Sequence, residues 1–171
     1  MKCRLLAAAA LALLPGAVQA QDTEWNRYTL EDLGGVFVRL EVAEPCEAAG
    51  VTAAMFEADV SLKLIEAEVG VLTMEEMLAH PAMPELRVSL DCANGGGSMA
   101  WSVALRVQQS AQMLRDTQIT LPEAVTWFSS ELGVSSQGGA ADAVGAAVMR
   151  QVDAFAEAWT AINADEEGGT G

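Results

Sequence analysis

The chain has 171 residues, of which 24 are acidic and nine are basic, so its formal net charge is −15 at pH 7. A surface this acidic repels nucleic acids and anionic lipid headgroups, which excludes both as electrostatic partners, and a charged partner is expected to be basic. The length suits one domain with a hydrophobic core of its own.

The first twenty residues have the pattern of a secretory signal peptide. Lys2 and Arg4 precede an apolar run over 5–14, and Val18-Gln19-Ala20 places small residues before Gln21. This run is about half as long as a membrane-spanning helix, and no later segment is apolar enough to be one. We expect cleavage near Ala20/Gln21 and a periplasmic or secreted protein. Cleavage removes two basic and no acidic residues, which leaves 151 residues with a formal net charge of −17.

Two cysteines follow the expected cleavage site, Cys46 and Cys92. In an oxidising compartment, a disulfide is the default state of such a pair. Two thiols with no nearby histidine cannot complete a zinc coordination shell. We therefore predict a Cys46–Cys92 disulfide and neither a metal nor a cofactor.

The polar segment 21–33 is interpreted as a loosely held N-terminal lead-in. After it, apolar and polar residues alternate over Val36–Val42, which is typical of a strand with one buried face. The residues expected to point inward are Val36, Val38, Leu40 and Val42.

The next apolar residues recur at steps of three and four, the spacing of one helix face. This helix is expected to begin after an N-cap at Thr52 and to stop at Gly70. Thr73-Met74-Glu75-Glu76 then has the capping-box pattern of a short helical turn that runs to Ala79. The predicted buried face of the longer helix contains Val51, Met55, Ala58, Leu62, Ile65 and Val69.

The most regular alternation lies in 86–92 and 99–108, which predicts a β-hairpin. Asn94–Ser98 joins its strands, and an Asn-Gly pair favours a tight hairpin turn. The second strand is expected to continue toward Leu114. The predicted inward residues are Leu86, Val88, Leu90, Cys92, Met99, Trp101, Val103, Leu105 and Val107.

A fourth strand is predicted over Val125–Ser130, after a break at Pro122, with Gly133–Gly139 as a flexible link. The last helix has an apolar residue at every third or fourth position. Residues 164–171 are acidic and rich in glycine, and are expected to form a flexible tail. The predicted buried stripe of the last helix contains Val144, Val148, Val152, Phe155, Trp159 and Ile162.

The predicted order β-α-β-β-β-α over residues 34–163 indicates one domain of the α+β class. Two helices on one face of a four-stranded mixed sheet would bury every apolar stripe, which gives a two-layer α/β sandwich. A right-handed crossover through the first helix makes strands 36–42 and 86–92 parallel. Their C-terminal ends then meet at one edge of the sheet, where Cys46 and Cys92 can approach each other.

Phe37 and Phe128 point, by alternation, to the polar face of the sheet. An aromatic pair on an open face marks either a partner surface or a place that a tail of the same chain covers. With Arg39, Arg87 and Arg106, the two rings form the predicted partner surface.

Four short motifs stand out beside the signal-peptide pattern: Gly35-Val36-Phe37-Val38, Ala49-Gly50-Val51-Thr52, Val71-Leu72-Thr73 and Thr126-Trp127. Together they resemble a family of uncharacterised exported bacterial proteins, over most of residues 34–163. The element order is also similar to small periplasmic sandwiches that accompany outer-membrane assembly. Neither resemblance implies a catalytic residue.

The chain's one histidine, His80, precedes Pro81, and no serine lies in a nucleophile-elbow context. We interpret His80 as structural or solvent-facing and predict no catalytic residue. The first hypothesis is an exported, non-catalytic module that binds a protein or an envelope component. The alternative is a small-ligand carrier with a pocket between sheet and helices near Met55, Trp101 and Trp159, and a hydrolase ranks third.

Overall fold

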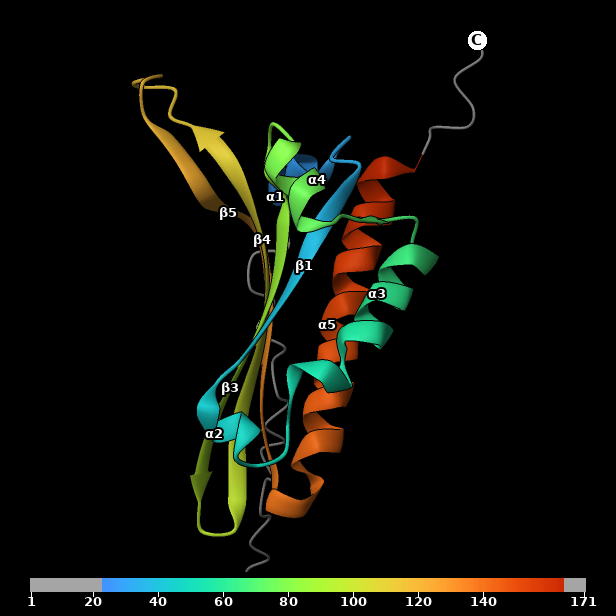
Figure 1. Ribbon diagram of the computed structural model, residues 1–171, viewed down its shortest axis with the longest axis vertical. Coiled ribbons are helices and arrows are strands. Elements are labelled where there is room, and N and C mark those ends of the chain that lie inside the picture. The colour runs from blue at the N-terminus through green and yellow to red at the C-terminus, as the bar shows by residue number, and fades with distance from the viewer. Residues whose placement is uncertain (1–22, 165–171) are drawn as a thin grey trace, which may run out of the picture.

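The computed structural model describes residues 23–164, in which a five-stranded mixed sheet packs against helices in an α+β fold (Figure 1). The expected signal peptide and the acidic residues Asp165-Glu166-Glu167 lie outside this range. The strands follow the spatial order β2-β1-β3-β4-β5. Their bounds are β1 Gly35–Val42, β2 Gly70–Val71, β3 Glu85–Gly95, β4 Ser98–Gln112 and β5 Thr120–Ser136.

Two longer helices, α3 (Glu57–Glu66) and α5 (Ala140–Asn163), lie side by side on one face of the sheet (Figure 1). Within residues 23–164, no helix is both long and apolar enough to cross a bilayer. The shorter helices are α1 Glu24–Arg27, α2 Glu44–Glu47 and α4 Met74–Ala79, with 3-10 turns at Tyr28–Leu30, Ala53–Met55 and Gln137–Gly139.

The pairing of β1 with β3 is parallel, as the crossover rule predicts, with Val38 opposite Leu86 and Leu40 opposite Val88. β3, β4 and β5 pair antiparallel in sequence order. Two register shifts interrupt the β4–β5 ladder between Val107 and Ala111. Beyond them the joined ends of these strands lean away from the helix layer (Figure 1), as β-bulges bend a ladder.

The short strand β2 was not predicted, because two residues carry no detectable alternation. Gly70 was expected only to stop a helix, but it pairs with Gly35 in a parallel ladder. A Cβ atom on Gly35 would collide with the backbone of Gly70. Glycine is therefore required at Gly35 by this close approach of two backbones.

The predicted alternation of the β3–β4 hairpin is confirmed, since its inward side chains lie in the hydrophobic core. The turn lies inside the predicted Asn94–Ser98 link, but not at the Asn94-Gly95 pair that was expected to favour it. The strands continue to a Gly95–Ser98 pair, and the two turn residues are Gly96 and Gly97, with φ of 59° and 84°. Two consecutive positive φ angles define the turn type that matches the twist of a hairpin.

β5 is much longer than the predicted Val125–Ser130, because it runs through both expected breaks. Pro122 is tolerated since β5 lies at the edge of the sheet, where a missing N–H disrupts no central ladder. Gly133 lies opposite Trp101, whose indole ring occupies the space that a Cβ atom would need. Gly133 therefore belongs to the packing of the sheet and not to a flexible link.

The start of the predicted first helix was also wrong. Thr52 precedes a 3-10 turn and its side chain makes no capping hydrogen bond, and α3 begins only at Glu57. The capping box of Thr73 and Glu76 in α4, by contrast, is confirmed in both directions.

The buried face of α3 differs from the predicted one. Phe56, Val60 and Leu64 enter the core instead. Val51 and Val69, which flank the helix, are buried as expected. The 3-10 turn changes the helical phase, and the packing of α3 on α5 selects the other stripe. The residues left exposed are Met55, Ala58, Leu62 and Ile65.

The predicted stripe of α5 is confirmed, with Ile162 only partly buried at its end. Phe155 packs edge-on against Trp127 of β5 at a ring-centroid distance of 5.3 Å and also against Trp159. Edge-to-face aromatic pairs of this kind favour one arrangement of the core. They fix α5 against the strand at the edge of the sheet.

The N-terminal segment is not loosely held over the part that the structure describes. Leu30 and Leu33 are buried in the core. The Gln109 side chain of β4 donates a 2.8 Å hydrogen bond to the carbonyl of Thr29. Residues 23–33 are thus packed into the domain.

Candidate interaction surface

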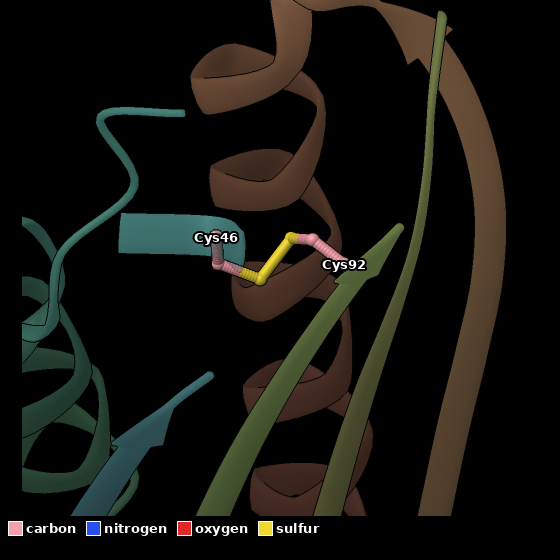
Figure 2. The surroundings of a disulfide bond; sticks show 2 residues. All are labelled: Cys46 and Cys92. Atoms are coloured by element: carbon pink, nitrogen blue, oxygen red, sulfur yellow. A yellow bond between two sulfur atoms is a disulfide. The ribbon is translucent and has the colours of Figure 1, made fainter. Parts of the chain in front are cut away.

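The Cys46–Cys92 disulfide is present, with a Cα–Cα distance of 5.1 Å (Figure 2). Cys46 lies in α2, directly after β1, and Cys92 lies in β3. The Ala43 amide donates a 2.9 Å hydrogen bond to the carbonyl of Leu90, so the ladder of these strands continues up to the bridge. The parallel pairing of β1 and β3 brings the two cysteines together, as the sequence predicted.

Four side chains lie in register across the sheet face opposite α3 and α5. Arg39 of β1 lies opposite Arg87 of β3, Arg87 lies opposite Arg106 of β4, and Arg106 lies opposite Phe128 of β5. We call these four residues the arginine row. Because neighbouring strands are about 4.8 Å apart, each side chain of the row can contact the next.

A buried carboxylate holds two arginines of the row. Glu85 Oε2 accepts from Arg39 Nε at 2.9 Å, and Glu85 Oε1 accepts from Arg87 Nη2 at 2.8 Å. Only 10% of the Glu85 side chain is exposed. A buried carboxylate needs such charged donors, because an unpaired one would lose its hydration without compensation.

Burial and the neighbouring carboxylates act on the pKa of Arg87 in opposite directions. Burial by itself lowers the pKa of the Arg87 guanidinium, but the hydrogen bond with Glu85 and the charges of Glu85, Glu41 and Glu123 raise it above its ordinary value. Arg87 therefore stays cationic.

The two phenylalanines each lie beside an arginine. The Arg39 guanidinium is 5.5 Å from the ring centroid of Phe37, and the Arg106 guanidinium is 5.5 Å from that of Phe128. These are cation–π distances, at which a ring face attracts a cation. The five predicted partner-surface residues thus share one face of the sheet.

Arg106 differs from its neighbours in the row. Its Nη1 donates a hydrogen bond of 3.5 Å to the Oγ of Ser89. Among the described residues, no carboxylate lies within 4.0 Å of it, whereas both other arginines of the row have one. Arg106 therefore has N–H donors that no described carboxylate takes up. Glu85 and Ser89, which organise the row, were missed because only the strand register reveals their neighbours.

The residues proposed for a carrier pocket do not come together. Met55 is on the surface, and the buried Trp101 ring packs onto Gly133. Trp159 borders a groove of about 330 Å³ beside Asp32 and the end of α5. Each side chain thus has a separate environment.

His80 has a local structural contact, since its Nδ1 accepts from the Ala82 amide at 3.1 Å. Within residues 23–164, no group of three or more His, Cys, Asp or Glu side chains could hold a metal ion. No family model matches the chain, and neither a curated protein nor a solved structure matches it.

Proposed function

We propose that the protein is an exported, non-catalytic module that binds a protein or an envelope component through the open face of its sheet. The observation that carries the proposal is the arginine row, with Phe37 beside it. Arginine and aromatic side chains are the residue types most enriched in binding hot spots. Here they are held in register by strands, so little conformational freedom remains to be lost on binding.

The row also determines the chemistry of contact. Glu85 fixes Arg39 and Arg87, and a Glu41 oxygen lies 3.7 Å from Arg87 Nε, so these two arginines present a rigid, largely neutralised surface. Arg106 lies between Ser89 and Phe128 with donors to spare. Arg106 could donate hydrogen bonds to a carboxylate or a backbone carbonyl of the partner, in the planar geometry that guanidinium groups favour.

The disulfide supports export. Such bonds persist in oxidising compartments and are rare in reducing ones. Together with the signal-peptide pattern of residues 1–20, the bridge supports a periplasmic or secreted location.

The test is a double substitution on the open face, Phe37→Ser with Phe128→Ser. Neither ring lies in the hydrophobic core of the described residues, so the melting temperature should change by less than about 3 °C. In a pull-down from the envelope fraction, the double variant should fail to capture the proteins that the wild-type mature protein captures. The matched control, Leu78→Ser with Leu114→Ser, removes two exposed apolar side chains elsewhere and should retain them.

Two results would contradict the proposal. If the phenylalanine variant does not fold, the rings are core residues, and a segment of the same chain covers this face. If the variant folds and captures the same bands as wild type, the open face is not the binding site.

A further inference from the structure

An apolar stripe on α3 and on the 3-10 turn before it is exposed at the surface of the described residues. Met55, Leu62 and Ile65 are 46%, 56% and 61% exposed. The opposite side of the helix, with Val60 and Leu64, fills the core, so the stripe is not needed to attach α3 to the sheet. Exposed large apolar residues at helical spacing are typical of a surface that another helix covers.

A groove follows the seam between α3 and α5, next to this stripe. Its central part has a volume of about 500 Å³ and a floor of small side chains, Ala67, Ala156 and Ala161. An adjoining hollow shares Lys63 and Glu66 with it and reaches Leu62 and Met149. A third hollow shares Ala67 and Thr160 with it and ends at Ala164. We call these joined hollows the α3–α5 trough.

The dimensions of the trough suit a helix. It follows α5 from Met149 to Ala164. At a rise of 1.5 Å per residue this is about 22 Å, or roughly four turns of a second helix lying alongside. Alanines in the floor allow a helix to approach closely, because the distance between packed helix axes, about 8–10 Å, is shortest when the side chains at the contact are small.

The walls of the trough are acidic. Lys63 is the one basic residue among its described lining residues, and Asp153 Oδ1 accepts a 2.9 Å hydrogen bond from Lys63 Nζ. That hydrogen bond raises the pKa of Lys63, and the two opposite charges of the pair cancel. The acidic residues that line the trough are Asp32, Asp59, Glu66, Glu68, Asp153 and Glu157.

This charge distribution selects the occupant. A second copy of the chain would bring the same acids against these walls, and like charges facing each other oppose association. A basic partner would neutralise them and be steered toward the trough from a distance. The apolar floor and stripe require that the same partner also present an apolar face.

We propose that the α3–α5 trough binds an amphipathic helix of a basic partner protein. Apolar side chains of that helix, spaced three and four residues apart, would cover Leu62, which lines the trough, and extend over Ile65, which is exposed three residues further along α3. Lysine or arginine on its flanks would face Glu66 of α3 and Glu157 of α5. This surface lies on the helix layer and is independent of the open sheet face.

The test uses a synthetic peptide of about 18 residues, made of leucine and lysine, with leucine at positions i, i+3, i+4 and i+7 of each repeat. Calorimetry with the mature, oxidised protein should detect saturable binding. Leu62→Ser with Ile65→Ser should weaken the affinity at least about tenfold, as should Glu66→Gln with Glu157→Gln. Both pairs lie on the surface, and a thermal melt checks that each variant folds.

Three controls separate the trough from general attraction to an acidic protein. Glu47→Gln with Glu75→Gln removes two exposed acids elsewhere and should leave the affinity unchanged within about twofold. Phe37→Ser with Phe128→Ser should also leave it unchanged, so this proposal and the sheet-face proposal can fail separately. A scrambled leucine–lysine peptide of the same composition should bind at least about tenfold more weakly.

Equal binding of the ordered and scrambled peptides would overturn the proposal, since charge alone would then explain it. So would affinities that the Leu62 and Ile65 changes do not alter. Sedimentation of the free protein as a dimer that Leu62→Ser with Ile65→Ser dissociates would assign the surface to a second copy instead.

Discussion

The two faces of the sheet are built from the same strands with the same alternation, but their side chains interact in different ways. On the covered face, Val88, Leu105 and Trp127 are fully buried against the helix layer. On the open face, Arg39 and Arg87 share the carboxylate of Glu85 in a network of directional bonds. Burial of apolar area stabilises a fold, whereas ion pairs near a surface contribute little to it. The stability of the fold therefore depends mainly on the covered face. The side chains of the open face contribute little to it.

The largest predicted effect concerns the disulfide that ties β3 to α2. Cys46→Ala with Cys92→Ala should lower the melting temperature of the mature protein by about 10 °C. A bridge that closes a 46-residue separation is worth roughly 4 kcal/mol in the chain-entropy treatment. Calorimetry measures the shift, and reduced wild-type protein should reproduce it. Two free thiols in the unfolded, unreduced wild type would contradict the bridge.

A smaller loss is expected from Gly133→Ala, which tests the packing of the covered face. The added methyl group would overlap the ring of Trp101, so the indole must move, at a cost of roughly 1–3 kcal/mol. The melting temperature should fall by about 3–9 °C. Gly138→Ala is the matched control, because a Cβ atom there meets nothing within 4 Å. Equal melting temperatures for the two variants would contradict the packing of Trp101 on β5.

The smallest effect concerns an ion pair between β5 and α5. The hydrogen bond from Arg150 holds the pKa of Glu131 below its ordinary value of 4.5. The folded state thus favours the carboxylate, so the contribution is complete above about pH 4.5 and is lost as the pH falls through the lowered pKa. Because both side chains are partly exposed, the contribution should be below about 1 kcal/mol.

Urea unfolding of wild type and Glu131→Gln at pH 7 and at low pH measures this contribution. The two proteins should differ at pH 7 and converge at low pH. For the control Glu47→Gln, which removes an exposed acid of α2, the difference from wild type in the free energy of unfolding should be the same at both pH values. An equal difference between wild type and Glu131→Gln at both pH values would exclude Glu131 as the titrating group.

The strands could be predicted well from the sequence because alternation allows only two orientations. In the β3–β4 hairpin one of the two faces is almost wholly apolar, so the need to bury that face decides the orientation. The same alternation placed Phe37 and Phe128 with the arginines. The contact of Glu85 with Arg39 could not be predicted in this way, because it depends on the register between β1 and β3.

The sequence of α3 carries two apolar stripes of similar strength, and only its packing against α5 shows which one is buried. The stripe with Leu62 and Ile65 was therefore expected in the core, so the sequence did not predict a surface groove beside it. In β5, Pro122 and Gly133 resemble breaks in any local pattern. They are compatible with a strand only because of the edge position and the Trp101 ring, neither of which is visible along the chain.

The disulfide also has a mechanical consequence. The covalent ring that it closes contains α3, β2 and α4, the whole crossover between β1 and β3. When the two chain ends are pulled apart, tension passes from Cys46 to Cys92 through the sulfur atoms and bypasses this crossover. About 160 Å of extended chain, at up to 3.6 Å per residue, stays out of the load path until the bond is reduced. One wall of the α3–α5 trough thus belongs to the part of the molecule that carries no load.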